Sequence, residues 1–487
     1  MSEPRVTSPR LSPHAVLFVL AGALLAACTS APDFVRVSLP QPPPRSEIDT
    51  PAQREHARIV ASYGGVYDDP KLAVMVGETV DRLVNASERP ELKYKVVILN
   101  SSAINAFALP NGQLYVTRGL LALANDRSEL ASVLAHEMSH VIARHAQIRE
   151  DQARQTAMIA TIANDVLKDP EVGALALAKS KLTLASFSRA QEFEADGLGI
   201  GIASRAGFDP YGAVRFLGDM QRFGELKTPG GEADPRASDF LATHPATPER
   251  VQNAQANARA FGTPGTGARE RAEYLGRLDG MVYGEDPSEG FVRGRRFLHP
   301  KLGFTFLAPP DFTLDNTAQA VLGIQEGGDE ALRFDVVQVA AEQTLPDYLN
   351  SGWIENVDPR SVQQFTINGF PAAGATAQGK EWSFKLYAVR FGSDVYRFIF
   401  AAKKPTATTD KAFRDSLNSF RRMTLQEVEN AKPLRIKIVT VGSNDTIETL
   451  SRKMAVSDKK HERFLVLNGL NPGEKLNPGA SVKIVVE

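Results

Sequence analysis

The pattern of apolar and polar positions divides the chain into segments of different character. After polar residues 1–14, an uncharged apolar run (AVLFVLAGALLAA) fills 15–27, and a proline-rich stretch fills 29–52. Apolar positions then recur at helical spacing, first over 53–86 and again over 126–146, where they lie nearly all round the helix. The pattern predicts an apolar leader, an extended tether and a mainly helical domain with a buried helix over 126–146.

Two further domains are predicted downstream. Residues 287–425 hold five strand-like and two helix-like runs, with a hairpin signal at Gly392-Ser393-Asp394, which predicts a mainly antiparallel sheet. Residues 436–487 read strand, helix, helix, strand. A glycine-rich linker over 262–268 closes the first domain, which spans 53–261. The predicted fold class is therefore multidomain α+β.

Composition narrows the possible functions. The chain has 487 residues, too many for one hydrophobic core, with 43% hydrophobic and 23% charged residues. A net charge of −1 gives no sign of a nucleic-acid partner. A single cysteine, Cys28, excludes a disulfide within the chain.

The surroundings of Cys28 indicate a targeting signal. The apolar run is too short to span a bilayer comfortably but suits a signal peptide. Its end, Leu25-Ala26-Ala27-Cys28, resembles the lipobox of bacterial lipoproteins. The resemblance implies a signal peptide over 1–28, lipidation of Cys28 and a periplasmic protein anchored to the outer membrane. The alternative is an ordinary signal peptide in which Cys28 is incidental.

The central helix carries a metal-binding pattern, His136-Glu137-Met138-Ser139-His140. Two histidines four residues apart share one helix face, so their imidazoles can converge on one metal ion. Glu137, next to the first histidine, can take a proton from a water at the metal. An isolated match of this kind also occurs by chance.

A second element downstream strengthens the metal site. Glu192 and Asp196 are again four residues apart on a predicted helix, flanked by apolar residues that imply partial burial. Glu192 is the expected third ligand, and Asp196 is expected to fix the tautomer of a ligand histidine. Glu194 is expected to be a solvated charge. A solvated face is the alternative for Glu192 and Asp196 too.

These motifs together resemble the gluzincin family that includes the HtpX heat-shock proteases and the CAAX prenyl endopeptidases. The family pattern stands here as the histidine motif at 136–140 and as Ser188-Arg189 followed by Glu192 and Asp196. The resemblance covers about residues 50–260 and is closest to the branch without membrane helices. It implies a zincin-type metallopeptidase with one zinc ion per chain and Glu192 as third ligand.

The same resemblance suggests further site residues. Asn105-Ala106-Phe107, before a strand, resembles the edge strand that binds an extended substrate, although a plain hairpin with an Asn-Gly turn is equally compatible. His244 and Arg250 resemble a segment near the metal, where His244 would stabilise the oxyanion, block the site or merely cap a loop. His145 is ~140° from His140 on a continuous helix and is not expected to be a ligand.

The two later domains carry weaker resemblances. Residues 287–425 resemble the PsbP/Mog1-type fold, with no cluster of catalytic residue types, which favours a packing or interaction module. Residues 436–487 resemble the LysM domain, a family that binds glycans such as peptidoglycan. A structural end-cap is the alternative for this C-terminal unit.

The sequence favours a zinc metalloendopeptidase that cleaves unfolded or misassembled envelope proteins, with Glu137 as general base. A second hypothesis is a catalytically silent scaffold that holds clients and peptidoglycan. A third, weaker one is a zinc-dependent peptidoglycan hydrolase.

Overall fold

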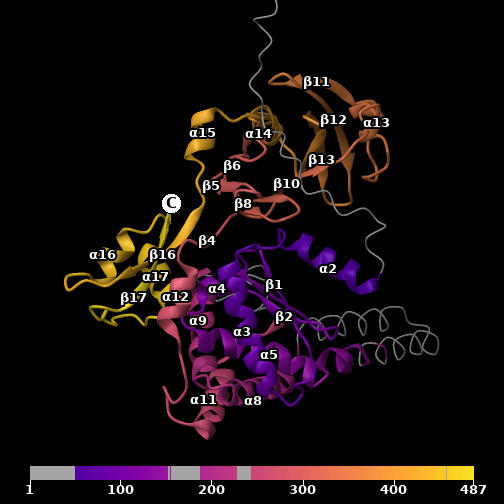
Figure 1. Cartoon of the computed structure of the whole chain (residues 1–487). Helices are drawn as coiled ribbons and strands as arrows, with labels where there is room; N and C mark the ends of the chain where they lie inside the picture. The colour runs from indigo at the N-terminus through magenta and orange to yellow at the C-terminus, as the bar shows by residue number, and fades with distance from the viewer. Residues whose placement is uncertain (1–49, 152–153, 155–186, 228–242, 457) are drawn as a thin grey trace, which may run out of the picture. The chain divides into compact units, whose positions relative to one another are not determined.

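The computed structural model describes residues 50–151, 154, 187–227, 243–456 and 458–487 (Figure 1). The predicted leader, with Cys28, and residues 29–49 of the predicted tether therefore lie outside the described residues. The prediction of an extended tether up to residue 52 was wrong at its end, because Pro51 begins a helix that Thr50 caps. No helix among the described residues is both long and apolar enough to cross a membrane.

The first domain begins with two helices and a small sheet. The helices are α2 (Pro51–Ser62) and α3 (Pro70–Ala86), and each starts at a side-chain cap and a proline. They confirm the helical pair predicted over 53–86. The sheet has the order β1-β3-β2 and places β2 at an edge; its strands are β1 (Lys95–Leu99), β2 (Ala106–Ala108) and β3 (Gln113–Thr117).

Helices make up the remainder of this domain: α4 (Arg118–Leu123), α5 (Arg127–Ile142), α8 (Arg189–Arg205), α9 (Gly212–Lys227), α11 (Pro248–Phe261) and α12 (Arg271–Leu278). Every residue of α5 from Arg127 to His140 is buried, as the all-round apolar pattern predicted. The prediction of one helix over 126–146 was wrong at its end. The helix stops at Ile142, and Arg144 takes a left-handed conformation with φ of 56°.

Gly199 allows α8 to pack closely on α5. A Cβ atom on Gly199 would lie 2.9 Å from the backbone nitrogen of His136, a separation that packed atoms do not adopt. The absence of a side chain at Gly199 therefore sets how near the two helices can approach.

The second domain is largely β-sheet, as predicted. A seven-stranded antiparallel sheet has the order β11-β12-β13-β14-β10-β9-β8, and a four-stranded one has the order β15-β7-β6-β5. The strands are β5 (Phe291–Arg293), β6 (Arg296–His299), β7 (Phe304–Leu307), β8 (Phe312–Asn316), β9 (Val321–Gln325), β10 (Glu330–Val337), β11 (Gln363–Ile367), β12 (Phe370–Gln378), β13 (Ser383–Phe391), β14 (Asp394–Ala402) and β15 (Arg421–Arg422). The helical elements are α13 (Leu345–Leu349), the 3-10 turn η3 (Pro359–Ser361), α14 (Ala407–Asn418) and α15 (Leu425–Asn430). Gly392 turns the predicted hairpin between β13 and β14 with φ of 67°.

The C-terminal unit has the predicted order of elements: β16 (Leu434–Thr440), α16 (Ile447–Arg452), α17 (Lys460–Asn468) and β17 (Ser481–Val486). β16 pairs antiparallel with β17 and with the short β4 (Val282–Tyr283). Its apolar side chains, such as Phe464 and Ile484, belong to the same buried cluster as Leu120 and Leu134 of the first domain. The unit is thus continuous with the core of the helical domain, although its resemblance to LysM stays a prediction.

A buried lysine ties this unit to the helical domain. The Lys483 ammonium is fully buried and donates to the carbonyls of Ala122, Leu123 and Ala124, at 2.7, 3.3 and 2.8 Å. These carbonyls belong to the last two residues of α4 and to its C-cap Ala124, where the carbonyls have no N–H partners within the helix. Burial lowers the pKa of Lys483 to about 7. The contact fixes the chain immediately before the N-cap of α5, Asp126.

Lys483→Met should lower the free energy of unfolding by about 1–3 kcal/mol, because it leaves buried carbonyls without donors. The melting temperature of the full-length chain measures the effect, with the exposed Lys475→Met as control. Equal melting temperatures for the two variants would contradict the role given to Lys483.

Candidate metal centre

Two histidines converge on one point from α5. His136 and His140 are buried, and their Nε2 atoms lie 3.1 Å apart. Asp126 stabilises the N-terminus of α5 as its N-cap, because its side chain accepts a hydrogen bond from the Glu129 backbone N–H at 3.0 Å. The spacing argument from the sequence therefore places both imidazoles on one helix face.

Helix α8 brings a carboxylate to the same point. Glu192 is 2% exposed; its Oε2 lies 3.6 Å from His136 Nε2, and its Oε1 lies 3.6 Å from His140 Nε2. A capping box between Ser188 and Gln191 stabilises the start of α8, whose first helical residue is Arg189. Glu192 is thus a buried member of the cluster, not part of a solvated face.

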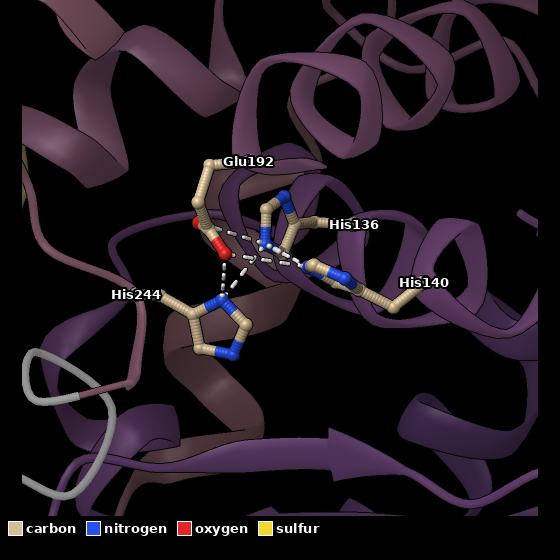
Figure 2. A group of neighbouring side chains, drawn as sticks. All are labelled: His136, His140, Glu192 and His244. Carbon is tan, nitrogen blue, oxygen red and sulfur yellow. Dashed lines mark hydrogen bonds and ion pairs between the residues drawn. The ribbon is translucent and has the colours of Figure 1, made fainter. Parts of the chain in front are cut away.

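His244, from the segment before α11, completes the cluster (Figure 2). Its Nδ1 lies 2.8 Å from Glu192 Oε1 and 3.2 Å from His136 Nε2. All four donor atoms lie within 4.8 Å of one another. A tetrahedral zinc ion with bonds of 2.0–2.1 Å would separate its ligand atoms by about 3.3 Å. The observed spacings, and the mixture of imidazole and carboxylate donors, fit such an ion.

The charges around the cluster also suit a divalent cation. Glu137, Glu192 and Asp196 are buried, with Arg250 as the buried cation beside them. Burial raises the pKa of Glu137 well above its usual range, and the Glu192 carboxylate raises it further. Burial also lowers the pKa of His136, and lowers that of His244 to about 3, which leaves neutral imidazoles able to act as ligands.

Asp196 and Arg250 contact each other and two residues of the cluster. Asp196 Oδ1 lies 2.9 Å from His136 Nδ1, and Arg250 donates to both oxygens of Asp196, at 2.7 and 2.9 Å. A further guanidinium nitrogen lies 2.7 Å from Glu192 Oε2. Burial alone would raise the pKa of Asp196, but the hydrogen bonds with Arg250 and His136 outweigh it and lower the pKa to about 2. Arg250 thus contacts the carboxylates that surround the cluster.

Glu137 faces an open cleft beside the cluster. It is 3% exposed, and its Oε1 has no hydrogen-bond partner within the described parts of the chain. His140 and His244 line the same cleft, which has a volume of about 640 Å³. A buried carboxylate oxygen without a donor, next to a metal-binding cluster, is placed to receive a proton from a bound water.

The predicted substrate-binding residues line this same cleft. Asn105, Ala106 and Phe107 border it, and the last two lie on the edge strand β2. Phe107 stacks on Tyr115 with ring centroids 4.9 Å apart, and Asn105 donates to the Tyr63 hydroxyl at 2.8 Å. β2 and β3 also form the hairpin that the Asn-Gly pair predicted. Hairpin and edge strand are therefore both present, and the outer edge of β2 adjoins the site.

Several polar residues lie differently from the sequence-based expectations. The sequence gives no sign that His56 is structural, yet it is partly buried and has its Nδ1 2.8 Å from the Tyr115 hydroxyl. Glu194 is 57% exposed but is not an unpartnered charge, because its Oε2 lies 3.2 Å from His145 Nε2. His145 contributes no atom to the four-residue cluster, as expected, yet it contacts His140 through Nδ1 at 2.9 Å. The spacing argument missed this contact because the chain leaves the helix at Arg144.

Comparisons with known proteins place the site in a family context. Residues 70–258 match the model of peptidase family M48. The β-barrel assembly-enhancing protease of Escherichia coli K12 is 31% identical over 203 residues, which cover 39% of this chain and 40% of that protein. The mitochondrial metalloendopeptidase OMA1 of Schizosaccharomyces pombe is 29% identical over 203 residues, 41% of this chain and 58% of that protein. The chain thus spans about half the length of the curated relatives it matches.

One solved structure matches part of the chain weakly. The solution structure of cyanobacterial PsbP from Synechocystis matches 28% of this chain and 98% of its own length, at 15% identity. The TM-score is 0.22, too low to establish a shared fold. The PsbP/Mog1-type resemblance of residues 287–425 stays a prediction.

Asp196→Asn should destabilise the metal-free chain by about 2 kcal/mol above pH 4, because the carboxylate has a pKa of about 2 when folded, below its ordinary value of 3.8 in the unfolded chain. A depressed folded pKa contributes stability that is complete above the unfolded value and is lost as the pH falls towards 2. Urea unfolding between pH 5 and pH 2 measures the difference, with the exposed Asp415→Asn as control. A difference that stays constant down to pH 2 would contradict it.

Proposed function

We propose that this chain, whose residues 70–258 form a domain of peptidase family M48, is a zinc-dependent endopeptidase of the cell envelope that acts in protein quality control. The observation that carries the proposal is the convergence of His136, His140 and Glu192 beside a cleft that also contains Glu137. Ligands, a proton acceptor and space for a polypeptide are what metal-assisted peptide hydrolysis requires. The relatives, one a protease and the other a metalloendopeptidase, support the same reaction class.

In this proposal His136, His140 and Glu192 hold one zinc ion. When bound, zinc supplies Lewis acidity that polarises the peptide carbonyl and makes a water more acidic. Glu137 accepts a proton from the attacking water and later delivers it to the leaving amine nitrogen. Asp196 fixes the His136 ring through Nδ1, and Arg250 orients Asp196 and Glu192, so Arg250 acts through its neighbours.

His244 has two possible positions in the working cycle. Its Nδ1 lies within the ligand cluster, where it would fill the fourth place that a catalytic zinc site keeps open for water or substrate. We propose that this is a resting arrangement and that the imidazole leaves the cluster before catalysis. Its Nε2, which lies 3.7 Å from Glu137 Oε1, would then interact with the oxyanion.

The cleft suits an extended polypeptide. β2 offers an edge for backbone pairing, and apolar side chains including Phe107, Leu109, Val141 and Phe187 line the walls. Edge pairing requires a segment that is free of its own secondary structure, which is a property of unfolded and misassembled proteins. We therefore propose such envelope proteins as substrates.

Two segments, one around Cys28 and one over residues 436–487, bear on the location of the protein in the cell. We propose that Cys28 is lipidated and anchors the protein to the periplasmic face of the outer membrane, and that residues 436–487 contact peptidoglycan. The lipobox-like Leu25–Cys28 segment supports the first proposal, and the LysM-like order of β16, α16, α17 and β17 supports the second.

The full-length chain should contain about one zinc ion and cleave an unfolded protein such as reduced casein. Glu137→Gln should keep the zinc and lower the cleavage rate by about 10²–10⁴-fold, because only the proton acceptor is lost. Chelation should abolish cleavage and added zinc should restore it. The exposed Glu225→Gln serves as control.

The other hypotheses give different results in the same experiment. Client binding without cleavage, by both the wild-type chain and Glu137→Gln, would favour a silent scaffold. Release of stem peptides from peptidoglycan sacculi, with proteins left intact, would favour a peptidoglycan hydrolase.

Cys28→Ser should abolish incorporation of radiolabelled palmitate by the chain expressed in Escherichia coli and should move it from the membrane to the soluble periplasmic fraction. Label retained by the variant, or absent from the wild-type chain, would refute lipidation at this residue.

A further inference from the structure

We infer that His145 and Glu194 are positioning residues for the metal ligand His140, forming a hydrogen-bonded relay that holds its ring and fixes its tautomer. The inference rests on the proposed function, since it concerns the same zinc site. It assigns a role to a histidine outside the ligand set and to a glutamate on the helix that supplies Glu192.

The backbone places His145 where a continuous helix would not. The helix α5 ends at Ile142, and the Arg144 N–H bonds to the Val141 carbonyl at 3.1 Å. Arg144 then adopts φ of 56°, an uncommon conformation for a residue with a side chain. This turn brings His145 back against His140, with ring centroids 5.0 Å apart and an interplanar angle of 72°.

The hydrogen atoms of the relay follow from the geometry. His140 Nε2 lies in the ligand cluster, so its lone pair faces the metal position and the ring proton resides on Nδ1. That Nδ1–H donates to His145 Nδ1 at 2.9 Å, which leaves the His145 proton on Nε2. His145 Nε2–H in turn donates to Glu194 Oε2 at 3.2 Å. One arrangement of protons therefore satisfies all three groups.

The two ligand histidines are then held in different ways. His136 meets the carboxylate of Asp196 directly, 2.9 Å from its Nδ1. His140 reaches a carboxylate through an intervening imidazole. His145 is 1% exposed, so the link to His140 is protected from competing water, whereas Glu194 is 57% exposed. Helix α8 consequently supplies the proposed ligand Glu192 and two further carboxylates. Asp196 contacts His136 directly, and Glu194 is linked to His140 through His145.

Partners behind metal-bound histidines orient the ring and raise its basicity, and their loss costs about 10–100-fold in metal affinity. The buried His145 should account for most of this effect. The exposed Glu194 should contribute less, because solvent screens its charge.

The test measures the zinc dissociation constant of the full-length chain by competition with a chromophoric chelator. His145→Phe keeps a planar ring but can neither accept nor donate, and should weaken zinc binding by about 10–100-fold. His145→Gln, which can still accept from His140 and donate to Glu194, should restore most of the affinity. His461→Phe removes a surface histidine whose Nδ1 lies 3.4 Å from Glu448 and should leave zinc binding unchanged.

The melting temperature of each zinc-free variant separates positioning from folding. Weaker zinc binding by His145→Phe, with a rescue by His145→Gln at equal zinc-free stability, supports the relay. Wild-type affinity in His145→Phe, or equal weakening by Phe and Gln, would overturn it. If His145→Phe does not fold, Glu194→Ala decides: a measurably raised dissociation constant supports the relay, and an unchanged one overturns it. A wild-type chain that bound no zinc would instead refute the proposed function, and the inference with it.

Discussion

The close packing of α8 against α5 is the constraint on which the site depends. Gly199 lets the α8 backbone approach until a Cβ at that position would touch the backbone of His136. At this separation the Glu192 carboxylate lies 3.6 Å from the imidazoles of both His136 and His140. The distance between two backbones, set by a residue that does no chemistry, thus determines whether three side chains can share one ion.

Burial makes this arrangement costly unless its charges are matched. Glu137, Glu192 and Asp196 lie together out of solvent, and the Arg250 guanidinium contacts two of them. A divalent cation among the four donor atoms would supply the remaining positive charge. The same burial that raises the pKa of Glu137 makes the site sensitive to whether that cation is present. We therefore expect a bound cation to stabilise this part of the core.

The C-terminal unit extends this core. Its apolar residues join the cluster that surrounds α5, and Lys483 holds the carbonyls that precede the α5 N-cap. The unit therefore supports the helical domain that carries the cluster.

The sequence by itself determined the parts of the site that depend on local helical geometry. Four-residue spacing placed His136 with His140 and Glu192 with Asp196. The apolar patterns also predicted a helical segment, a mainly antiparallel sheet and a strand-helix-helix-strand unit in the correct order. The family resemblance extended this to His244, Arg250 and the edge strand.

Only the tertiary structure decided how these pieces meet. Three features depend on contacts between segments distant in sequence. His244 directs its Nδ1 into the cluster, and Arg250 bridges Asp196 and Glu192. The C-terminal unit shares its core with the helical domain. The contact of His145 with His140 was missed for a related reason. Helical periodicity holds only while the backbone stays helical, and the left-handed turn at Arg144 leaves no periodic signal in the sequence.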